Sequence, residues 1–230
     1  MPASLVSGFV FDRSRQVAPQ IFDFLRERIV SVQIAPGTIM SRAELQSQFG
    51  VSQTPVRDAL LKLEEEGLVQ VYPQHATLVS RINISQARQA HFMRRAIEAN
   101  IAFSLARNPT EALIIELNRA NDLVRTAAKA DDLTLFLSAD REFHKIMYQY
   151  SDMMMIWGIV RSNSGHLDRL RRLNLPKLGV QRIVREHETL MSAIEQKKPQ
   201  QAAEAMQAHL ANTLTMLDEV AKEHPEFIER

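Results

Sequence analysis

The stretch GVSQTPVRDALLKLEEEGLV, from Gly50 to Val69, constrains the fold of this chain more than any other. Proline has no amide hydrogen and is tolerated in a helix only within the first turn, so Pro55 marks the start of a helix. Ser52 or Thr54 can cap that start, and Gly67 can provide a left-handed stop. Between these limits the apolar residues recur at helical spacing and predict one buried stripe, made of Val56, Ala59, Leu60 and Leu63.

Other predicted elements lie on either side of this helix in the sequence. A first helix is predicted from Ala18 to Val32 and a second from about Arg42 to Phe49. After Gly67, two β-branched or apolar runs separated by PQHA predict a small β-hairpin. The order helix, helix–turn–helix, hairpin is that of a winged helix-turn-helix, whose second motif helix is placed to enter the major groove of DNA. The alternative is a small helical subdomain in which the helix–turn–helix is only a packing corner.

From Ser85 onward the chain is predicted to be helical almost throughout. The fold class is therefore mainly α, with an N-terminal winged helix-turn-helix (a small β-hairpin wing) followed by a C-terminal all-α helical bundle. The predicted helices of the bundle cover about residues 85–107, 110–128, 132–150, 154–173, 180–197 and 200–221. The predicted division is a loose N-terminal arm over residues 1–14, the winged domain over 15–82 and the helical domain over 83–230.

Composition excludes several classes of protein. The chain has no cysteine, which rules out disulfides and thiolate metal sites, and no apolar run long enough to predict a transmembrane helix. The N-terminus lacks the features of a secretory signal, so we expect a cytoplasmic protein with no membrane partner. The net charge is only +1, and basic and acidic residues are equally numerous between Phe11 and Asn83. DNA binding would therefore depend on where positive charge is placed, not on its total.

Four polar residues fall on otherwise apolar helix faces in the second domain. Asp140 and His144 are four residues apart and project from one face, while His187 and His209 occupy inward positions of two later helices. Buried polar groups normally meet one another or a shared partner, because leaving them unpaired is costly. A carboxylate and three imidazoles in a bundle suit a divalent metal ion: zinc, nickel, manganese or iron. For each single histidine, the alternative is an ordinary hydrogen-bonded core residue.

Three further residues are candidates for binding a ligand beside that site. The predicted inward stripe of the helix over 154–173 includes Asn163 and His166, which we expect to line the same cavity. Arg94 could neutralise a carboxylate ligand with two parallel hydrogen bonds. The alternative for Arg94 is a salt bridge to Glu98, four residues along the same helix.

Both halves of the chain resemble one family, the GntR-type bacterial transcription regulators, in the FadR subgroup with a C-terminal FCD ligand-binding domain. The first match is PGTIMSRAELQSQFGVSQTPVRDALLKLEEEGLVQV, which follows the family pattern of Pro-Gly, a Glu-Leu helix, VSxTPVRxAL and LxxxGLV. The second is Asp140-x3-His144 with His187 and His209, which look like the four metal-binding positions of the FCD domain. RRAIE, ending at Glu98, resembles the start of that domain's first helix, where an arginine often helps to hold the ligand. The resemblance covers about residues 17–218.

The resemblance implies a sequence-specific DNA-binding transcriptional regulator, expected to be a repressor, and not an enzyme. Its helical domains would pair into a homodimer, and two recognition helices would read a palindromic operator in double-stranded DNA. A small organic acid would act as the effector by binding the metal through its carboxylate. The alternatives are a metal-responsive regulator without an organic effector and a metal-dependent enzyme, although no separate general base or nucleophile is evident.

The resemblance also implies which residues contact DNA. They are expected at the start of the two motif helices and at the wing tip, namely Arg42, Ser52, Gln53, Thr54, Arg57 and His75. The family often has arginine where this chain has Ala43 and Gln53, and usually glycine where Ala76 follows the histidine of the wing tip. We therefore expect two guanine-directed contacts to be lost, with Gln53 favouring adenine and Arg42 partly substituting.

Overall fold

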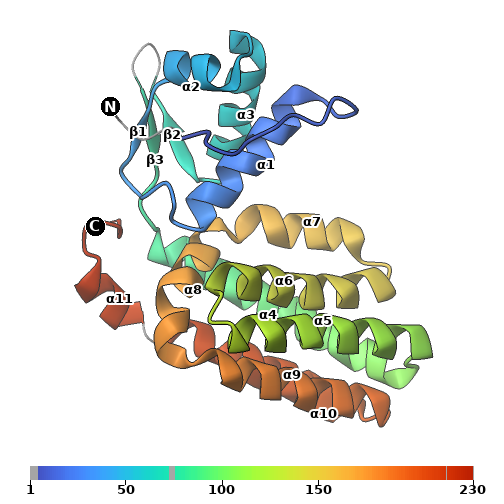
Figure 1. Cartoon of the computed structure of the whole chain (residues 1–230). Helices are drawn as coiled ribbons and strands as arrows, with labels where there is room; N and C mark the ends of the chain where they lie inside the picture. The colour runs from blue at the N-terminus through green and yellow to red at the C-terminus, as the bar shows by residue number, and fades with distance from the viewer. Residues whose placement is uncertain (1–4, 73–75, 216, 230) are drawn as a thin grey trace. The chain divides into compact units, whose positions relative to one another are not determined.

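The computed structural model describes residues 5–72, 76–215 and 217–229, and it divides into two compact units (Figure 1). The N-terminal unit comprises Met1–Ile84 together with Ala221–Arg230, and the helical unit comprises Ser85–Val220. Within the described ranges, no helix is both long enough and apolar enough to cross a membrane.

The N-terminal unit is built on three helices: α1 (Val17–Val30), α2 (Arg42–Phe49) and α3 (Gln53–Glu65). The apolar stripe of α3 is buried as predicted, and α3 packs against α1 and α2. Gly50 ends α2 with a φ of 66°, and Gly67 follows α3 with a φ of 69° while its amide donates to the Glu64 carbonyl at 2.8 Å. Both glycines adopt the left-handed backbone that other residues avoid, so the predicted turn and stop of the motif are confirmed.

A three-stranded antiparallel sheet completes the winged fold. Its strands are β1 (Ile39–Met40), β2 (Val69–Val71) and β3 (Thr77–Val79), in the order β1-β3-β2. Strands β2 and β3 form the predicted hairpin, with Val69 opposite Val79. Strand β1 was not predicted, because two residues are too few to show a period; its pairing with β3 defines it.

The two ends of the chain depart from the sequence-based expectation. Residues 5–14 were expected to be part of a loose arm, but the Phe9 ring packs 4.7 Å from Phe24 and 5.2 Å from Phe49, measured between ring centroids. At the other end, the Ile82 amide donates to the Phe227 carbonyl at 2.7 Å, and the Glu229 amide donates to the Ile82 carbonyl at 3.0 Å. The last residues therefore pair with the segment that follows the wing, although the sequence placed them with the bundle.

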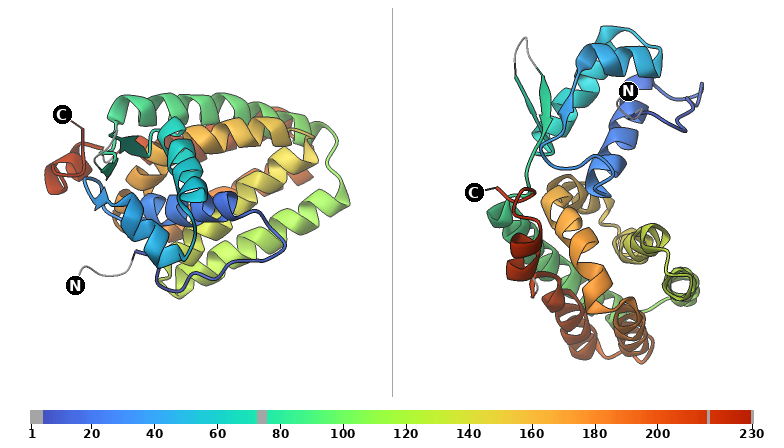
Figure 2. Two further views of the ribbon diagram at one scale, coloured as in Figure 1. Left: turned by 90° about the horizontal axis from the view of Figure 1, so that it is seen from above. Right: turned by 60° about the vertical axis from the view of Figure 1, so that its left-hand side comes forward.

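In the helical unit, α5 packs against α6 and α9, and α9 lies beside α10 (Figures 1 and 2). Two of the predicted helices are interrupted, the one over 154–173 and the one over 200–221, which is divided into α10, η1 and α11. Residues 154–173 form two helices because the helix is interrupted at Ser164. The Ser164 hydroxyl donates to the Val160 carbonyl at 2.6 Å. The elements of this part of the chain are α4 (Ile84–Arg107), α5 (Glu111–Lys129), α6 (Leu133–Tyr150), α7 (Met154–Asn163), α8 (Gly165–Leu178), α9 (Val180–Glu195), α10 (Pro199–Ala211), the short 3-10 helix η1 (Asn212–Leu214) and α11 (Leu217–Glu223).

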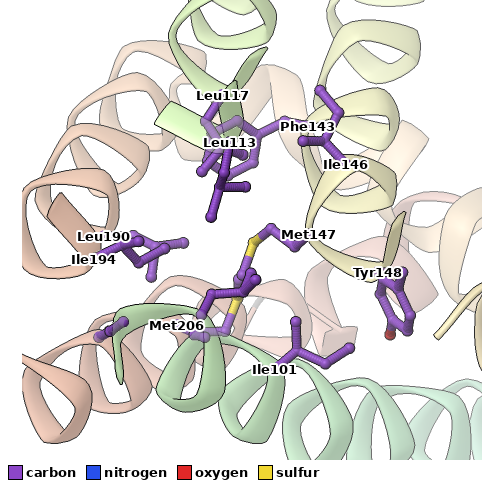
Figure 3. Close-up of a cluster of buried hydrophobic side chains, with 14 of the residues drawn as sticks. Ile101, Leu113, Leu117, Phe143, Ile146, Met147, Tyr148, Leu190, Ile194 and Met206 are labelled. Carbon is purple, nitrogen blue, oxygen red and sulfur yellow. The ribbon is translucent and has the colours of Figure 1, made fainter. Parts of the chain in front are cut away.

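The core of the helical unit joins six of these helices, α4, α5, α6, α7, α9 and α10 (Figure 3). Each buried side chain of this size contributes about 1.5–3 kcal/mol, so the cluster fixes which face of each helix points inward. Its larger members are Ile101 of α4, Leu113 and Leu117 of α5, Phe143 and Met147 of α6, Leu190 and Ile194 of α9, and Met206 of α10. Any polar residue in register with these stripes is carried into the interior.

Candidate metal centre and nucleic-acid interface

Four polar residues meet inside the helical unit. Asp140 and His144 come from α6, His187 from α9 and His209 from α10, and all four are buried. One potential ligand atom from each lies within 4.8 Å of those of the others. The i,i+4 spacing on α6 and the inward positions on α9 and α10 therefore bring together the set of residues expected from the sequence.

The inward-facing atoms of this cluster are poorly satisfied by one another. His187 Nε2 lies 3.5 Å from Asp140 Oδ1, and neither atom has a hydrogen bond within the described part of the chain. His144 Nε2 and His209 Nε2 face each other at 3.2 Å. Buried polar atoms without partners are rare, so this arrangement calls for a shared partner at the centre.

The outward-facing ring nitrogens are close to side-chain oxygens. Each Nδ1 lies against a side-chain oxygen from a different helix: His144 is 2.7 Å from Glu98 Oε2, His187 is 3.1 Å from Asn121 Oδ1, and His209 is 3.0 Å from Glu186 Oε2. Because an oxygen accepts, Nδ1 is assigned as the protonated nitrogen, and each Nε2 turns a lone pair inward. Two such lone pairs 3.2 Å apart repel each other unless a cation lies between them.

The charge states also suit a metal ion. Burial would raise the pKa of the Asp140 carboxyl, but Arg171, which donates to its Oδ2 at 2.6 Å, holds that pKa well below its usual range. Burial lowers the pKa of both His187 and His209. A carboxylate and neutral imidazoles are the forms that bind a divalent ion, so the residues present fit a metal such as zinc, nickel, manganese or iron.

Sequence reasoning missed most of the outer contacts. Asn121 lies on the buried face of α5, in register with Leu117 and Val124, and that register could have identified it. Arg171 and Glu186 could not be assigned this way, because whether they reach Asp140 or His209 depends on how helices pack. Such outer partners orient metal ligands and tune their affinity.

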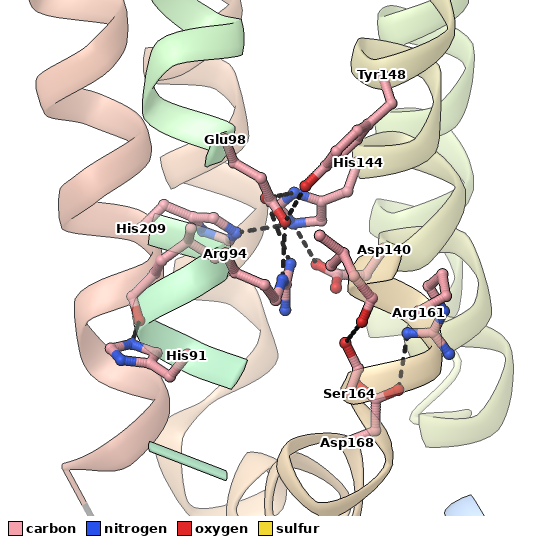
Figure 4. Close-up of polar contacts among 12 residues, drawn as sticks. His91, Arg94, Glu98, Asp140, His144, Tyr148, Arg161, Ser164, Asp168 and His209 are labelled. Atoms are coloured by element: carbon pink, nitrogen blue, oxygen red, sulfur yellow. Dashed lines mark hydrogen bonds and ion pairs between the residues drawn. The ribbon is translucent and has the colours of Figure 1, made fainter. Parts of the chain in front are cut away.

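The three expected effector residues have different surroundings. Arg94 is buried and its Nε donates to Glu98 Oε1 at 2.8 Å, which is the alternative considered for it (Figure 4). Burial disfavours its charge, but Glu98 outweighs burial and raises the pKa of Arg94 above its usual value. His166 is buried on α8, with Nδ1 2.9 Å from an Arg169 nitrogen, and it is not among the four converging residues.

The expectation that Asn163 lines this cavity is wrong. Its side chain is exposed, and its amide donates to the Ile159 carbonyl on the same helix at 2.8 Å. The expectation assumes one helical period through Ser164, but α7 ends at Asn163 and α8 begins at Gly165, so the inward stripe does not run through unchanged. The triplet Asn-Ser-Gly at this point was a turn signal that could have shown the break.

A small cavity adjoins the four-residue cluster. Its volume is about 20 Å³, which holds roughly one water molecule. Its lining comes from α8, α9, α10 and η1: Arg171, Asn174, Leu175, Arg182, Ile183, His209, Leu210 and Asn212. The cavity thus touches one of the four clustered residues directly and a second through the Arg171–Asp140 contact.

In the N-terminal unit, the expected DNA contacts gather at the start of α3. Ser52, Gln53, Thr54 and Arg57 are all exposed, and the Ser52 side chain makes no capping hydrogen bond. Arg57 is 57% exposed and its guanidinium bonds only to the adjacent Asp58 among the contacts described, at 3.1 Å. The first-turn amides and an arginine are thus presented together at the positive end of a helix dipole.

The two remaining candidates are placed differently. Arg42 is half-buried at the first position of α2. His75 lies outside the described residues.

Comparison with known families gives two matches that together span most of the chain. The model for "Bacterial regulatory proteins, gntR family" matches residues 18–79, and the model for "FCD domain" matches residues 89–212. These are the two halves that the sequence motifs indicated.

Individual proteins agree with these matches. The HTH-type transcriptional repressor RspR of Escherichia coli (strain K12) is 30% identical over 93% of this chain and 94% of its own length. The gluconate operon transcriptional repressor of Bacillus subtilis (strain 168) is 28% identical over 75% and 73%. Among solved structures, E. coli McbR/YncC covers 89% of this chain and 98% of its own, with a TM-score of 0.78 at 18% identity, which shows a shared fold. These relatives are regulators, and they confirm the expectation of a regulator rather than an enzyme.

Proposed function

The chain belongs to the GntR family of bacterial transcription regulators and carries a C-terminal FCD domain, and from that premise we propose that it is a repressor controlled by a small carboxylate bound at a divalent metal. We expect it to act in the cytoplasm as a homodimer. Two α3 helices about 34 Å apart would then read the half-sites of a palindromic operator in double-stranded DNA.

The N-terminal unit supports the DNA-reading part of this proposal. Arg57 and the exposed start of α3 supply a base or phosphate contact, and Gln53 favours adenine. Ser52 and Thr54 lie beside them for phosphate contacts, and Arg42 flanks them on α2. The total charge of the unit does not attract DNA, so affinity would depend on this local arrangement.

The observation that carries the metal part is the inward convergence of Asp140, His144, His187 and His209, with atoms that lack other partners. These four residues would hold the ion. When bound, a divalent ion supplies a positive charge at which a carboxylate oxygen can coordinate. Glu98, Asn121 and Glu186 keep the Nε2 lone pairs turned inward. A ligand that binds one dimer arrangement better than another shifts DNA affinity, typically by about 1–3 kcal/mol.

A second candidate is control by the metal alone. It is favoured by the size of the adjoining cavity, which at about 20 Å³ has room for roughly one water molecule. In this case the four ligands would form a closed site, and no organic molecule would take part.

A gel mobility shift tests both candidates. An operator is first selected from random duplex DNA by the full-length protein, and binding is then measured for the metal-free protein, the zinc-loaded protein and the zinc-loaded protein with each of a panel of small carboxylates. We expect at least one carboxylate to change the affinity only when zinc is present. A change with zinc alone and none with any carboxylate favours the second candidate, and no effect of either contradicts both.

A further inference from the structure

The charged residues around the four clustered residues come in pairs. Each of the three carboxylates lies against one arginine: Glu98 is 2.8 Å from Arg94, Asp140 is 2.6 Å from Arg171, and Glu186 is 3.4 Å from Arg182. Asp140 belongs to the cluster, and the other two carboxylates contact its histidines. The third histidine, His187, meets the uncharged Asn121.

These pairs leave the cluster without net charge. Three carboxylates balance three guanidinium groups, and the imidazoles that face inward are neutral in the tautomers assigned above. A divalent ion would therefore bring two positive charges that no protein group offsets. Because an unpaired charge in a buried site is strongly unfavourable, the loaded site should recruit two negative charges from outside the protein.

The cavity beside His209 shows where the second of these charges can go. Arg171 and Arg182 both line it, so an anion that enters the cavity meets two guanidinium groups. The Nε of Arg182 is buried and makes no hydrogen bond in the described structure, since the 3.4 Å approach of Glu186 is an ion pair only. The Arg182 side chain is also 32% exposed, so the outer wall can open through a change of rotamer.

We propose that the metal-loaded site selects a small dicarboxylate, with one carboxylate at the metal and the other received by Arg182 and Arg171. This rests on the proposed function, in that it requires a metal and a carboxylate effector. In this arrangement Arg94 stays paired with Glu98 and is not the anion receptor. The apolar Leu175, Ile183 and Leu210 along the same cavity would meet the carbon chain between the carboxylates.

The test compares succinate with butyrate, which have the same carbon skeleton length but differ by one carboxylate. Binding of each to the zinc-loaded full-length protein is measured by isothermal titration calorimetry, alongside the zinc content of each sample. The variants are Arg182→Met, which removes the charge but keeps most of the side-chain volume, and the matched control Arg185→Met, an exposed arginine on the same helix.

We expect succinate to bind the wild-type protein and the control at least about tenfold more tightly than butyrate, as charge-assisted pairing with arginine implies. Arg182→Met should abolish that preference. It should keep full zinc content, because without the guanidinium group of Arg182 the Glu186 carboxylate is free to attract the cation. Equal affinity for the two acids in the wild type, an unchanged preference in Arg182→Met, or loss of zinc from Arg182→Met would each overturn the proposal. Absence of zinc from the wild type contradicts the metal part of the proposed function itself.

Discussion

The start of α3 and the centre of the helical unit both gather polar residues, but in opposite environments. Arg57 and its neighbours are consecutive in the sequence and exposed, whereas Asp140 and the three histidines are distant in the sequence and buried. An exposed group can be changed with little effect on folding. A buried polar group is tied to the partners around it, so its function and the stability of its unit are linked. The four experiments that follow test this contrast.

The largest effect is expected from removing one buried imidazole. His187→Ala should abolish the stabilisation that zinc gives to the helical unit, which amounts to about 4 kcal/mol when zinc is a thousandfold above its dissociation constant. The measurement is the shift in melting temperature on adding zinc, together with the zinc content. His224→Ala, in the N-terminal unit, is the control and should keep the shift. A normal zinc content in His187→Ala would show that the cluster does not hold the ion.

The exposed counterpart is Arg57→Ala. Loss of a base or phosphate contact should weaken operator binding by about 1–3 kcal/mol, or about fivefold to 150-fold. The melting curve should not change, because Arg57 is 57% exposed. Mobility shift and thermal melting of the same preparation measure the two effects, with the exposed Arg15→Ala as a control. Unchanged DNA affinity would show that Arg57 does not contact the operator.

A smaller effect should follow from removing an outer partner. Asn121→Ala deletes the oxygen that accepts from His187 Nδ1 and should lower zinc affinity by about tenfold. Competition with a chelating dye measures the affinity. Asn121→Asp keeps an acceptor oxygen and should largely restore binding, whereas Asn118→Ala, at an exposed position of the same helix, should have no effect. If Asn121→Asp binds zinc as weakly as Asn121→Ala, Asn121 acts through packing and not through its hydrogen bond.

The smallest effect is expected from deleting residues 224–230, which removes the two backbone hydrogen bonds made with Ile82. The N-terminal unit should lose about 1 kcal/mol of stability, since two hydrogen bonds at a chain end contribute about 0.5 kcal/mol each, the low end of the usual range. Zinc affinity should be unchanged, because the helical unit keeps all four clustered residues. Hydrogen exchange at the Ile82 amide, together with zinc titration, checks both points. A loss of zinc binding would show that the zinc affinity of the helical unit depends on the N-terminal unit, contrary to the contrast drawn above.

The sequence could predict features that depend on local periodicity. The stripe of α3, its glycine stop and the inward positions of Asp140 and His144 each follow from spacing along one helix. The meeting of His187 and His209 with that pair followed from the cost of burying them alone. The helix–turn–helix of the N-terminal unit and the four-residue cluster could therefore be predicted from the sequence.

Features that depend on packing between distant segments could not be predicted from the sequence. The partners Arg171 and Glu186 and the pairing of the last residues with Ile82 arise only when helices and chain ends are placed in space. Asn163 was misplaced because one undetected break at Ser164 redirects the residues around it. A periodic pattern gives the face of a helix but not where that helix ends or what it packs against.

The pairing of Ile82 with Ile228 also has a consequence for the design of chimeras between this protein and related regulators. Because the chain leaves the N-terminal unit near Ile84 and rejoins it near Ala221, the bundle is an inserted module with two junctions. A chimera joined only at the first junction would take its helical unit and its C-terminal residues from another regulator. Those C-terminal residues would then have to pair with the Ile82 segment of this chain. Grafts that respect both junctions should fold better than single-crossover fusions.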